Sequence, residues 1–169
     1  MRSLKDLFNE YQAQHQNHTN VLVHAMGIPA ILLGTLILLS WISISVVTRW
    51  HITFAWIGAI AALIYYYRLD IKLAAVMTIV LVILTLICSW IAFPSPNTFS
   101  VILFIILFFG GWILLFIGYT LEKSKPALMT TLLHILIAPL FLLMEMLVML
   151  KLKKYFDIEG VTPHNKEVL

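Results

Sequence analysis

The chain has 169 residues, of which 62% are hydrophobic and 11% are charged, and its formal net charge is +3. Soluble domains have about 45–50% apolar and about 25% charged residues, so this composition excludes an ordinary water-soluble domain and favours one membrane domain. The basic residues are spread over several loops, which excludes a nucleic-acid surface and favours contacts with lipid headgroups.

The N-terminal segment, residues 1–20, is polar and holds both acids and bases, unlike a cleavable signal peptide. Its apolar residues follow the spacing of one helix face: Leu4, Leu7, Phe8 and Tyr11. We therefore expect a short amphipathic helix lying in the membrane interface. The Asn and Thr residues between Gln16 and Asn20 favour a break after it.

Five apolar segments follow, and their lengths predict membrane-spanning helices. They run from residue 21 or 29 to 47, then over 52–67, 73–93, 99–119 and 127–150. A span needs about 20 apolar residues, so four segments fit well and the second is short. Pro29 suits an early helical position, and residues 94–97 predict a tight turn. Cys88 is the chain's one cysteine, so no disulfide framework is expected.

These segments predict an all-α fold, a polytopic transmembrane helix bundle of four or five spans. It would form a single membrane domain over residues 1–169, with the bundle in 21–150 and a polar tail in 151–169. The fifth segment holds His134, Pro139 and Glu145, which makes it a candidate for a bent or re-entrant element. The positive-inside rule favours a cytoplasmic N-terminus, but the basic tail disagrees, so the side of the C-terminus stays open.

With five spans, three polar clusters fall on one side of the membrane. They are His15, Asn17, His18, Asn20 and His24; Tyr65, Tyr66, Tyr67, Arg68 and Asp70; and Tyr119, Glu122, Lys123 and Lys125. His134 lies within about two helical turns of the same surface, since a helix rises about 1.5 Å per residue. Such a gathering indicates a site on the cytoplasmic side. The alternative is a set of ordinary interfacial loops, which also carry Tyr, Lys and Arg.

The histidines of the first cluster point to a transition metal, because imidazole suits iron, zinc and copper. At about 100° per residue, Asn17, Asn20 and His24 share one face of a continuous helix, and His15 points the opposite way. His15 and His24 can therefore bind one ion only if the helix breaks between them. His18 lies beside His15 on the helical wheel and is a second candidate. The alternative is that these His and Asn side chains satisfy backbone ends.

Other chemistries find little support in the sequence. His134 lies in an apolar segment, where ionisable groups are often functional. Glycine-rich phosphate loops and serine nucleophile elbows are missing, and Gly110-Gly111 predicts close helix packing. The spans carry few polar residues, which argues against a channel or carrier.

These motifs, taken in order, resemble those of the 2-hydroxy fatty acid dioxygenases, a small family of membrane proteins. The matching residues are Tyr11, His15, Asn17, Asn20, His24 and Pro29; 66–70; 111–112, 116–118 and 122–128; and 138–141 with Glu145. The resemblance covers most of the chain. It implies a multi-pass enzyme of the bacterial inner membrane or the endoplasmic reticulum. That enzyme would use iron(II) and O2 to shorten 2-hydroxy fatty acids by one carbon, in α-oxidation.

The resemblance also implies roles for individual residues. It implies iron ligands at His15 and His24, with His18 and His134 as further candidates. The acyl tail of a long-chain 2-hydroxy fatty acid would lie among the spans and membrane lipid. Its carboxylate would meet Arg68, Lys123 or Lys125, and the candidate catalytic residues are Asn17, Asn20, Tyr119 and Glu122.

The sequence departs from the family pattern at three positions. Leu115 stands where the family usually has Gln, Tyr119 where it has His, and Thr130 where it has an acidic residue. His18 or His134 would then compensate, or Tyr119 would bind the metal as a phenolate, as Tyr does in some haem sites. A third explanation is a protein that keeps the fold and binds lipid without catalysis.

Overall fold

The computed structural model describes residues 18–47, 50–94, 96–122, 137–144 and 146–147. The elements are α2 (His18–Trp41), β1 (Ser43–Val47), β2 (Trp50–Thr53), α3 (Phe54–Leu69), α4 (Ile71–Ala92) and α5 (Thr98–Glu122). Residues 137–144 and 146–147 are also helical. The predicted amphipathic helix falls almost wholly in residues 1–17, outside the described residues.

Three of the described helices are long and apolar enough to cross a membrane, over Leu22–Trp41, Ile71–Ala92 and Thr98–Gly118. The helix α3 is apolar but shorter, with 16 residues. At 1.5 Å per residue it is about 24 Å long, less than the hydrocarbon thickness of about 30 Å. The prediction of a helical membrane bundle is therefore confirmed, as is the shortness of its second segment.

Two sequence expectations about the first span are wrong. Residues 43–47 form strand β1 and not the end of the helix, because Ser alternates there with β-branched residues, a period of two. Pro29 lies in the middle of α2 and not near its start. A proline inside a membrane helix is tolerated because neighbouring helices and local adjustments satisfy the freed carbonyl.

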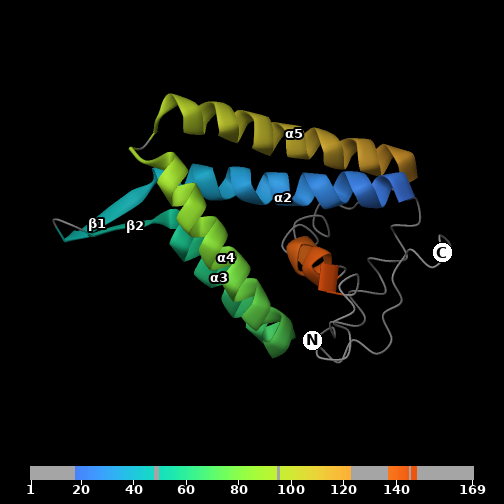
Figure 1. Ribbon diagram of the computed structural model, residues 1–169, viewed down its shortest axis with the longest axis horizontal. Coiled ribbons are helices and arrows are strands. Elements are labelled where there is room, and N and C mark those ends of the chain that lie inside the picture. Colours follow the sequence, from blue (N-terminus) through green and yellow to red (C-terminus); the bar gives the residue numbers. More distant parts are fainter. Residues whose placement is uncertain (1–17, 48–49, 95, 123–136, 145, 148–169) are drawn as a thin grey trace.

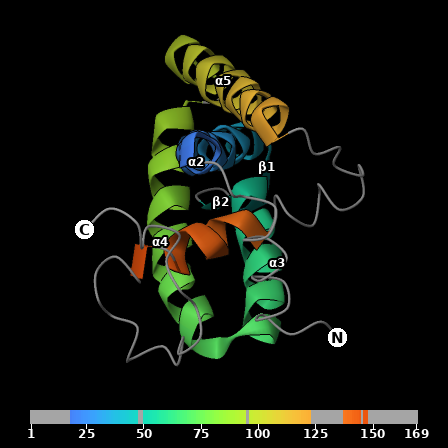
Figure 2. The same ribbon diagram turned by 90° about the vertical axis from the view of Figure 1, so that its right-hand side faces the viewer.

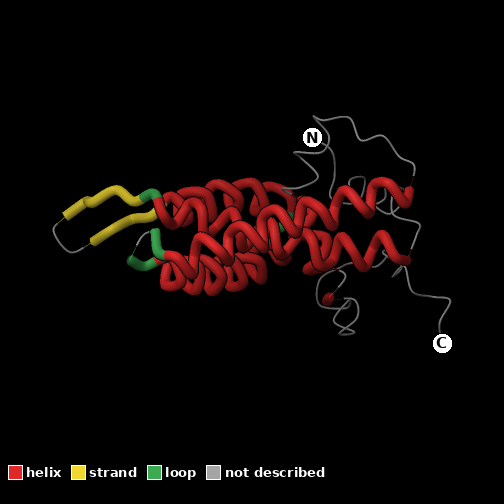
Figure 3. Tube along the Cα trace, turned by 90° about the horizontal axis from the view of Figure 1, so that it is seen from above, coloured by secondary structure: helices red, strands yellow, loops and turns green. Residues whose placement is uncertain are grey.

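The helices α2 and α5 run antiparallel and side by side over their length (Figures 1 and 3). Glycines allow this close approach: a Cβ atom on Gly34 would lie 2.9 Å from the backbone N of Phe108. A Cβ atom on Gly111 would lie 2.9 Å from the carbonyl oxygen of Gly27, whereas one on Gly110 would meet nothing within 4 Å. Close packing at Gly110-Gly111 is thus confirmed for Gly111 and wrong for Gly110.

The predicted turn between the third and fourth segments is confirmed, and Asn97 organises it. The Nδ2 of Asn97 donates to the carbonyl oxygen of Ile91 at 2.9 Å, and its Oδ1 accepts from the backbone N–H of Ser100 at 2.9 Å. The hydroxyl of Ser100 also accepts from Trp41 Nε1 at 3.1 Å. Asn97 therefore caps α5, and its neighbour Ser100 ties that cap to the end of α2.

A single residue, Asp70, joins α3 to α4. Its backbone N–H donates to the carbonyl oxygen of Tyr66 at 3.0 Å, and its Oδ1 accepts from the N–H of Leu73 at 2.8 Å. Asp70 thus ends one helix and caps the next, so α3 and α4 form a tight helical hairpin. This pair diverges from the α2–α5 pair with distance from the β-strands (Figure 1).

The helical residues 137–144 and 146–147, here called the wedge helix, lie between the two diverging pairs (Figure 2). They complete a core with residues of α3 and α4: Tyr66, Leu73, Ala74, Met77, Leu81, Ile137, Leu140, Phe141, Met144 and Leu147. Ala138 contributes to a second core with Ile28, Ile31 and Leu115, from α2 and α5. The expectation of a bent or re-entrant element stays a prediction, because most of the fifth apolar segment falls outside the described residues.

Candidate functional site

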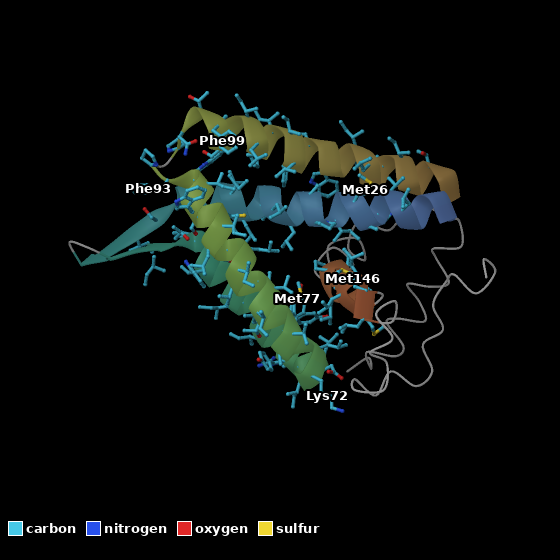
Figure 4. The ribbon with its side chains drawn as sticks, in the orientation of Figure 1. Met26, Lys72, Met77, Phe93, Phe99 and Met146 are labelled. Atoms are coloured by element: carbon cyan, nitrogen blue, oxygen red, sulfur yellow. The ribbon has the colours of Figure 1, made fainter. Side chains whose placement is uncertain are left out.

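The start of α2 and the end of α5 lie side by side at the end of the bundle away from the β-hairpin, and the α3–α4 turn also lies away from the hairpin, at the far end of the diverging pair (Figures 1 and 3). We call this the site end. The three polar clusters of the sequence begin at these helix ends. The exposed Lys72 marks the α3–α4 turn in Figure 4.

His24 is the candidate metal ligand whose side chain the structure describes, and it is buried, with 3% of its surface exposed. It lies one helical turn before Ile28, on the face of α2 that packs inward. Gly34 packs against Phe108, and Gly27 against Leu115. Continuing this antiparallel register by one turn brings His24 level with Gly118, which is also buried. The imidazole therefore lies inside the bundle, beside the last turns of α5.

The helix α2 begins at His18, within the stretch where the sequence predicted a break. His18, Asn20 and His24 consequently share one continuous helix, and Asn20 lies one turn before His24 on the same face. His15 and Asn17 lie outside the described residues. A bend that would bring His15 to His24 therefore remains a prediction, and residues 18–24 do not supply it.

The motif at residues 66–70 serves mainly to build the helical hairpin. Tyr66 is buried in the core, and Asp70 caps α4. The hydroxyl of Tyr67 is 3.2 Å from the hydroxyl of Thr78 on α4. The side chain of Arg68 is exposed in the last turn of α3. Of this motif, Arg68 is the residue that remains open to an anionic ligand.

The structure describes the remaining candidate residues only in part. Tyr119 and Glu122 lie in the last turns of α5, one turn apart along the same face, with only their backbone described. Lys123, Lys125 and His134 fall outside the described residues. Within the described ranges, no three His, Cys, Asp or Glu side chains come together as a metal site. The structure therefore brings His24 and the end of α5 together, and the other expected ligands stay predictions.

An apolar layer that sequence reasoning missed lies directly below His24. It consists of Ile28, Ile31, Leu115 and Ala138, contributed by three separate elements. The spacing of His24, Ile28 and Ile31 along one helix face was the available signal. Leu115 is 3% exposed and belongs to this layer.

The side chains that the structure describes near His24 supply part of a set of iron ligands. A buried imidazole is a suitable ligand for iron. The facing residues Leu115 and Gly118 carry no donor atom in their side chains. Further ligands would have to come from the last turns of α5 or from residues outside the described ranges. Tyr119 is the nearest such residue along α5.

A family model described as 2-hydroxy-palmitic acid dioxygenase Mpo1-like matches residues 1–150. No curated protein and no solved structure matches the chain. The matched stretch takes in every described element and all of the candidate residues. The chain therefore belongs to the 2-hydroxy-palmitic acid dioxygenase Mpo1-like family.

Proposed function

We propose that the protein is a membrane-embedded, iron(II)-dependent dioxygenase that cleaves 2-hydroxy fatty acids to a product one carbon shorter. The family name supports the substrate class and the use of O2. The observation that carries the proposal is His24, an imidazole buried at the site end above an apolar layer. Ionisable side chains within membrane helices are rare and are commonly functional.

Iron would be held by His24 and His15, with His18, His134 or Tyr119 completing the set. When bound, iron(II) supplies the binding and activation of O2 and a contact for the substrate hydroxyl. The chain's own residues provide the surroundings. The apolar layer beneath His24 excludes water, which strengthens the electrostatic interactions at the site.

The substrate would lie with its acyl tail along the apolar helices and its carboxylate at the site end. Arg68, Lys123 and Lys125 are the candidate contacts for this carboxylate; Arg68 is exposed in the last turn of α3, and Lys123 and Lys125 follow α5 in the sequence. Arg suits this role because its planar fork can bind a carboxylate in a bidentate way. Asn17, Asn20 and Glu122 would orient the 2-hydroxyl group or hold its proton.

A second candidate function is lipid binding without catalysis. It is favoured by Leu115, which is buried and packs against Ile28 and Ala138. The family's Gln at this place would present an amide, whereas Leu115 extends the apolar layer. On this alternative the site end would hold an acyl chain and no iron, and replacing His15 with Ala would leave function and stability unchanged.

The two functions differ in iron content and turnover. The chain would be purified under reducing conditions, placed in lipid nanodiscs with iron(II), and given a long-chain 2-hydroxy fatty acid and O2. We expect about one iron per chain and a product one carbon shorter, measured by metal analysis and mass spectrometry. Iron far below one equivalent together with no loss of substrate would overturn the dioxygenase proposal. Turnover would refute the lipid-binding alternative.

The variant His24→Ala should lose both iron and turnover. Ser40→Ala is the matched control, because Ser40 is equally buried in α2 but lies at the opposite end. We expect Ser40→Ala to keep its iron and its activity. Circular dichroism of both variants separates loss of the site from loss of the fold.

A further inference from the structure

The β-hairpin at the other end of the bundle has two unlike faces. The strands β1 and β2 pair antiparallel, with Ile44 opposite Ile52 and Ser43 opposite Thr53. Because successive residues of a strand point to opposite faces, the Ile pair and the Ser–Thr pair lie on different faces. Ile42 extends the Ile face, since its carbonyl oxygen accepts from the N–H of Phe54 at 2.9 Å and continues the ladder.

The isoleucine face, defined as Ile42, Ile44 and Ile52, is uncovered. These side chains are 51%, 50% and 44% exposed. A two-stranded hairpin is at best marginally stable in water and needs a surface that covers its apolar face. Among the residues that the structure describes, no element lies over this face.

The surroundings of the hairpin indicate a lipid surface. Trp90, Phe93 and Phe99 are 81%, 77% and 64% exposed and lie at the same end of the bundle as the hairpin. Figure 4 shows Phe93 and Phe99 near the root of the hairpin. Aromatic side chains gather at the boundary between membrane and water. The isoleucine face and these exposed aromatic side chains therefore lie at the same end of the bundle.

The helix lengths place the hairpin at the depth of this boundary. The helices α3 and α4 meet at Asp70, where α3 ends and α4 begins, and they have 16 and 22 residues. At 1.5 Å per residue, α3 is about 9 Å the shorter of the two. The hairpin therefore starts deeper in the membrane than the end of α4. It leaves the bundle on the side of α3 and α4, away from α5 (Figure 1).

We propose that the β1–β2 hairpin is an interfacial anchor that lies on the bilayer surface opposite the site end. Its isoleucine face meets the acyl chains, and the exposed Ser43 on the opposite face meets the headgroups and water, whereas the hydroxyl of Thr53 on that face is buried against the protein. The paired strands satisfy much of their own backbone hydrogen bonding, which makes insertion of the apolar face favourable. This proposal is independent of the catalytic one.

The test places an environment-sensitive fluorophore on single engineered cysteines in phosphatidylcholine vesicles. The positions are Ile44→Cys and Ile52→Cys on the isoleucine face, Ser43→Cys on the other face, and Lys72→Cys at the α3–α4 turn. The wild-type chain, whose Cys88 is buried, gives the background labelling. Quenching is measured with lipids that carry nitroxides in their acyl chains and with aqueous iodide.

We expect labels at 44 and 52 to be quenched by the lipid nitroxides, and severalfold less by iodide than the label at 72. The neighbouring label at 43 should be quenched by iodide more strongly than the label at 44. Equal access of iodide to positions 43, 44 and 72 would overturn the proposal. Protection at 44 that disappears when the protein is diluted in lipid would also overturn it, because a second copy would then cover the face.

Discussion

Two neighbouring glycines of α5 should respond differently to the same substitution. A Cβ atom on Gly111 would lie 2.7 Å from Ile31 Cγ1 and 2.9 Å from the carbonyl oxygen of Gly27, both on α2. A Cβ atom on Gly110 would meet no atom within 4 Å. Gly111→Ala therefore has to separate α2 from α5 or move their backbones, whereas Gly110→Ala adds a methyl group in open space.

The size of the difference follows from what the two variants share. Each gains helix propensity, since Ala is favoured over Gly by about 0.8–1.0 kcal/mol in a helix interior. Gly111→Ala also carries an overpacking cost of about 1–3 kcal/mol. Because the propensity gain cancels in the comparison, we expect Gly111→Ala to be less stable than Gly110→Ala by about 1–3 kcal/mol.

Both variants would be unfolded reversibly in mixed micelles by adding sodium dodecyl sulfate, with helicity followed by circular dichroism. The measured quantity is the free energy of unfolding of each variant. If Gly111→Ala proved as stable as Gly110→Ala, the glycine-dependent contact between α2 and α5 would be refuted. Gly34→Ala gives an independent check, because its Cβ atom would lie 2.9 Å from the backbone N of Phe108.

Two further predictions use the same unfolding assay. Asp70→Ala removes the acceptor for the N–H of Leu73 and should cost about 0.5–2 kcal/mol, whereas Asp70→Asn keeps a capping oxygen and most of the stability; equal losses in the two variants would contradict the cap. Phe141→Ala should lower the free energy of unfolding, but by less than the loss of about 3–5 kcal/mol that is typical of soluble cores. The smaller loss is expected because lipid supplies no hydrophobic driving force for packing between helices. Phe109→Ala is the control, because the Phe109 side chain is 53% exposed. If Phe109→Ala lost as much stability as Phe141→Ala, the packing of the wedge helix would be contradicted.

The long helices could be predicted from the sequence because lipid imposes a simple rule. A backbone in hydrocarbon must bond to itself, so long apolar runs become helices that end near polar residues or turns. The bounds of the apolar runs at 73–93 and 99–119 accordingly agree with those of α4 and α5 to within a few residues. The strand β1 was not predicted because an average of hydropathy along the chain does not distinguish a helical period from the period of two of a strand. The alternation of Ser with β-branched residues was the better signal.

The surroundings of His24 were beyond sequence reasoning for a different reason. Helical spacing alone places His24 on the face of Ile28 and Ile31. Which residues of α5 meet that face depends on the register between two antiparallel helices, set by contacts such as Gly34 with Phe108. The resemblance marked Leu115 as a departure, but only packing places it in the layer below His24.

The wedge helix explains how the described part of the fifth apolar segment organises the space between the two helix pairs. Phe141 is buried against the α3–α4 pair, and Ala138 is buried against α2 and α5. These two residues are three positions apart on one short helix, so the helix holds the diverging pairs at a defined separation. His24 lies on one pair and Arg68 on the other. The wedge helix therefore helps to set the separation of the two pairs, together with the direct contacts of α2 with α3 and α4, and Phe141→Ala should weaken substrate binding even where iron is retained.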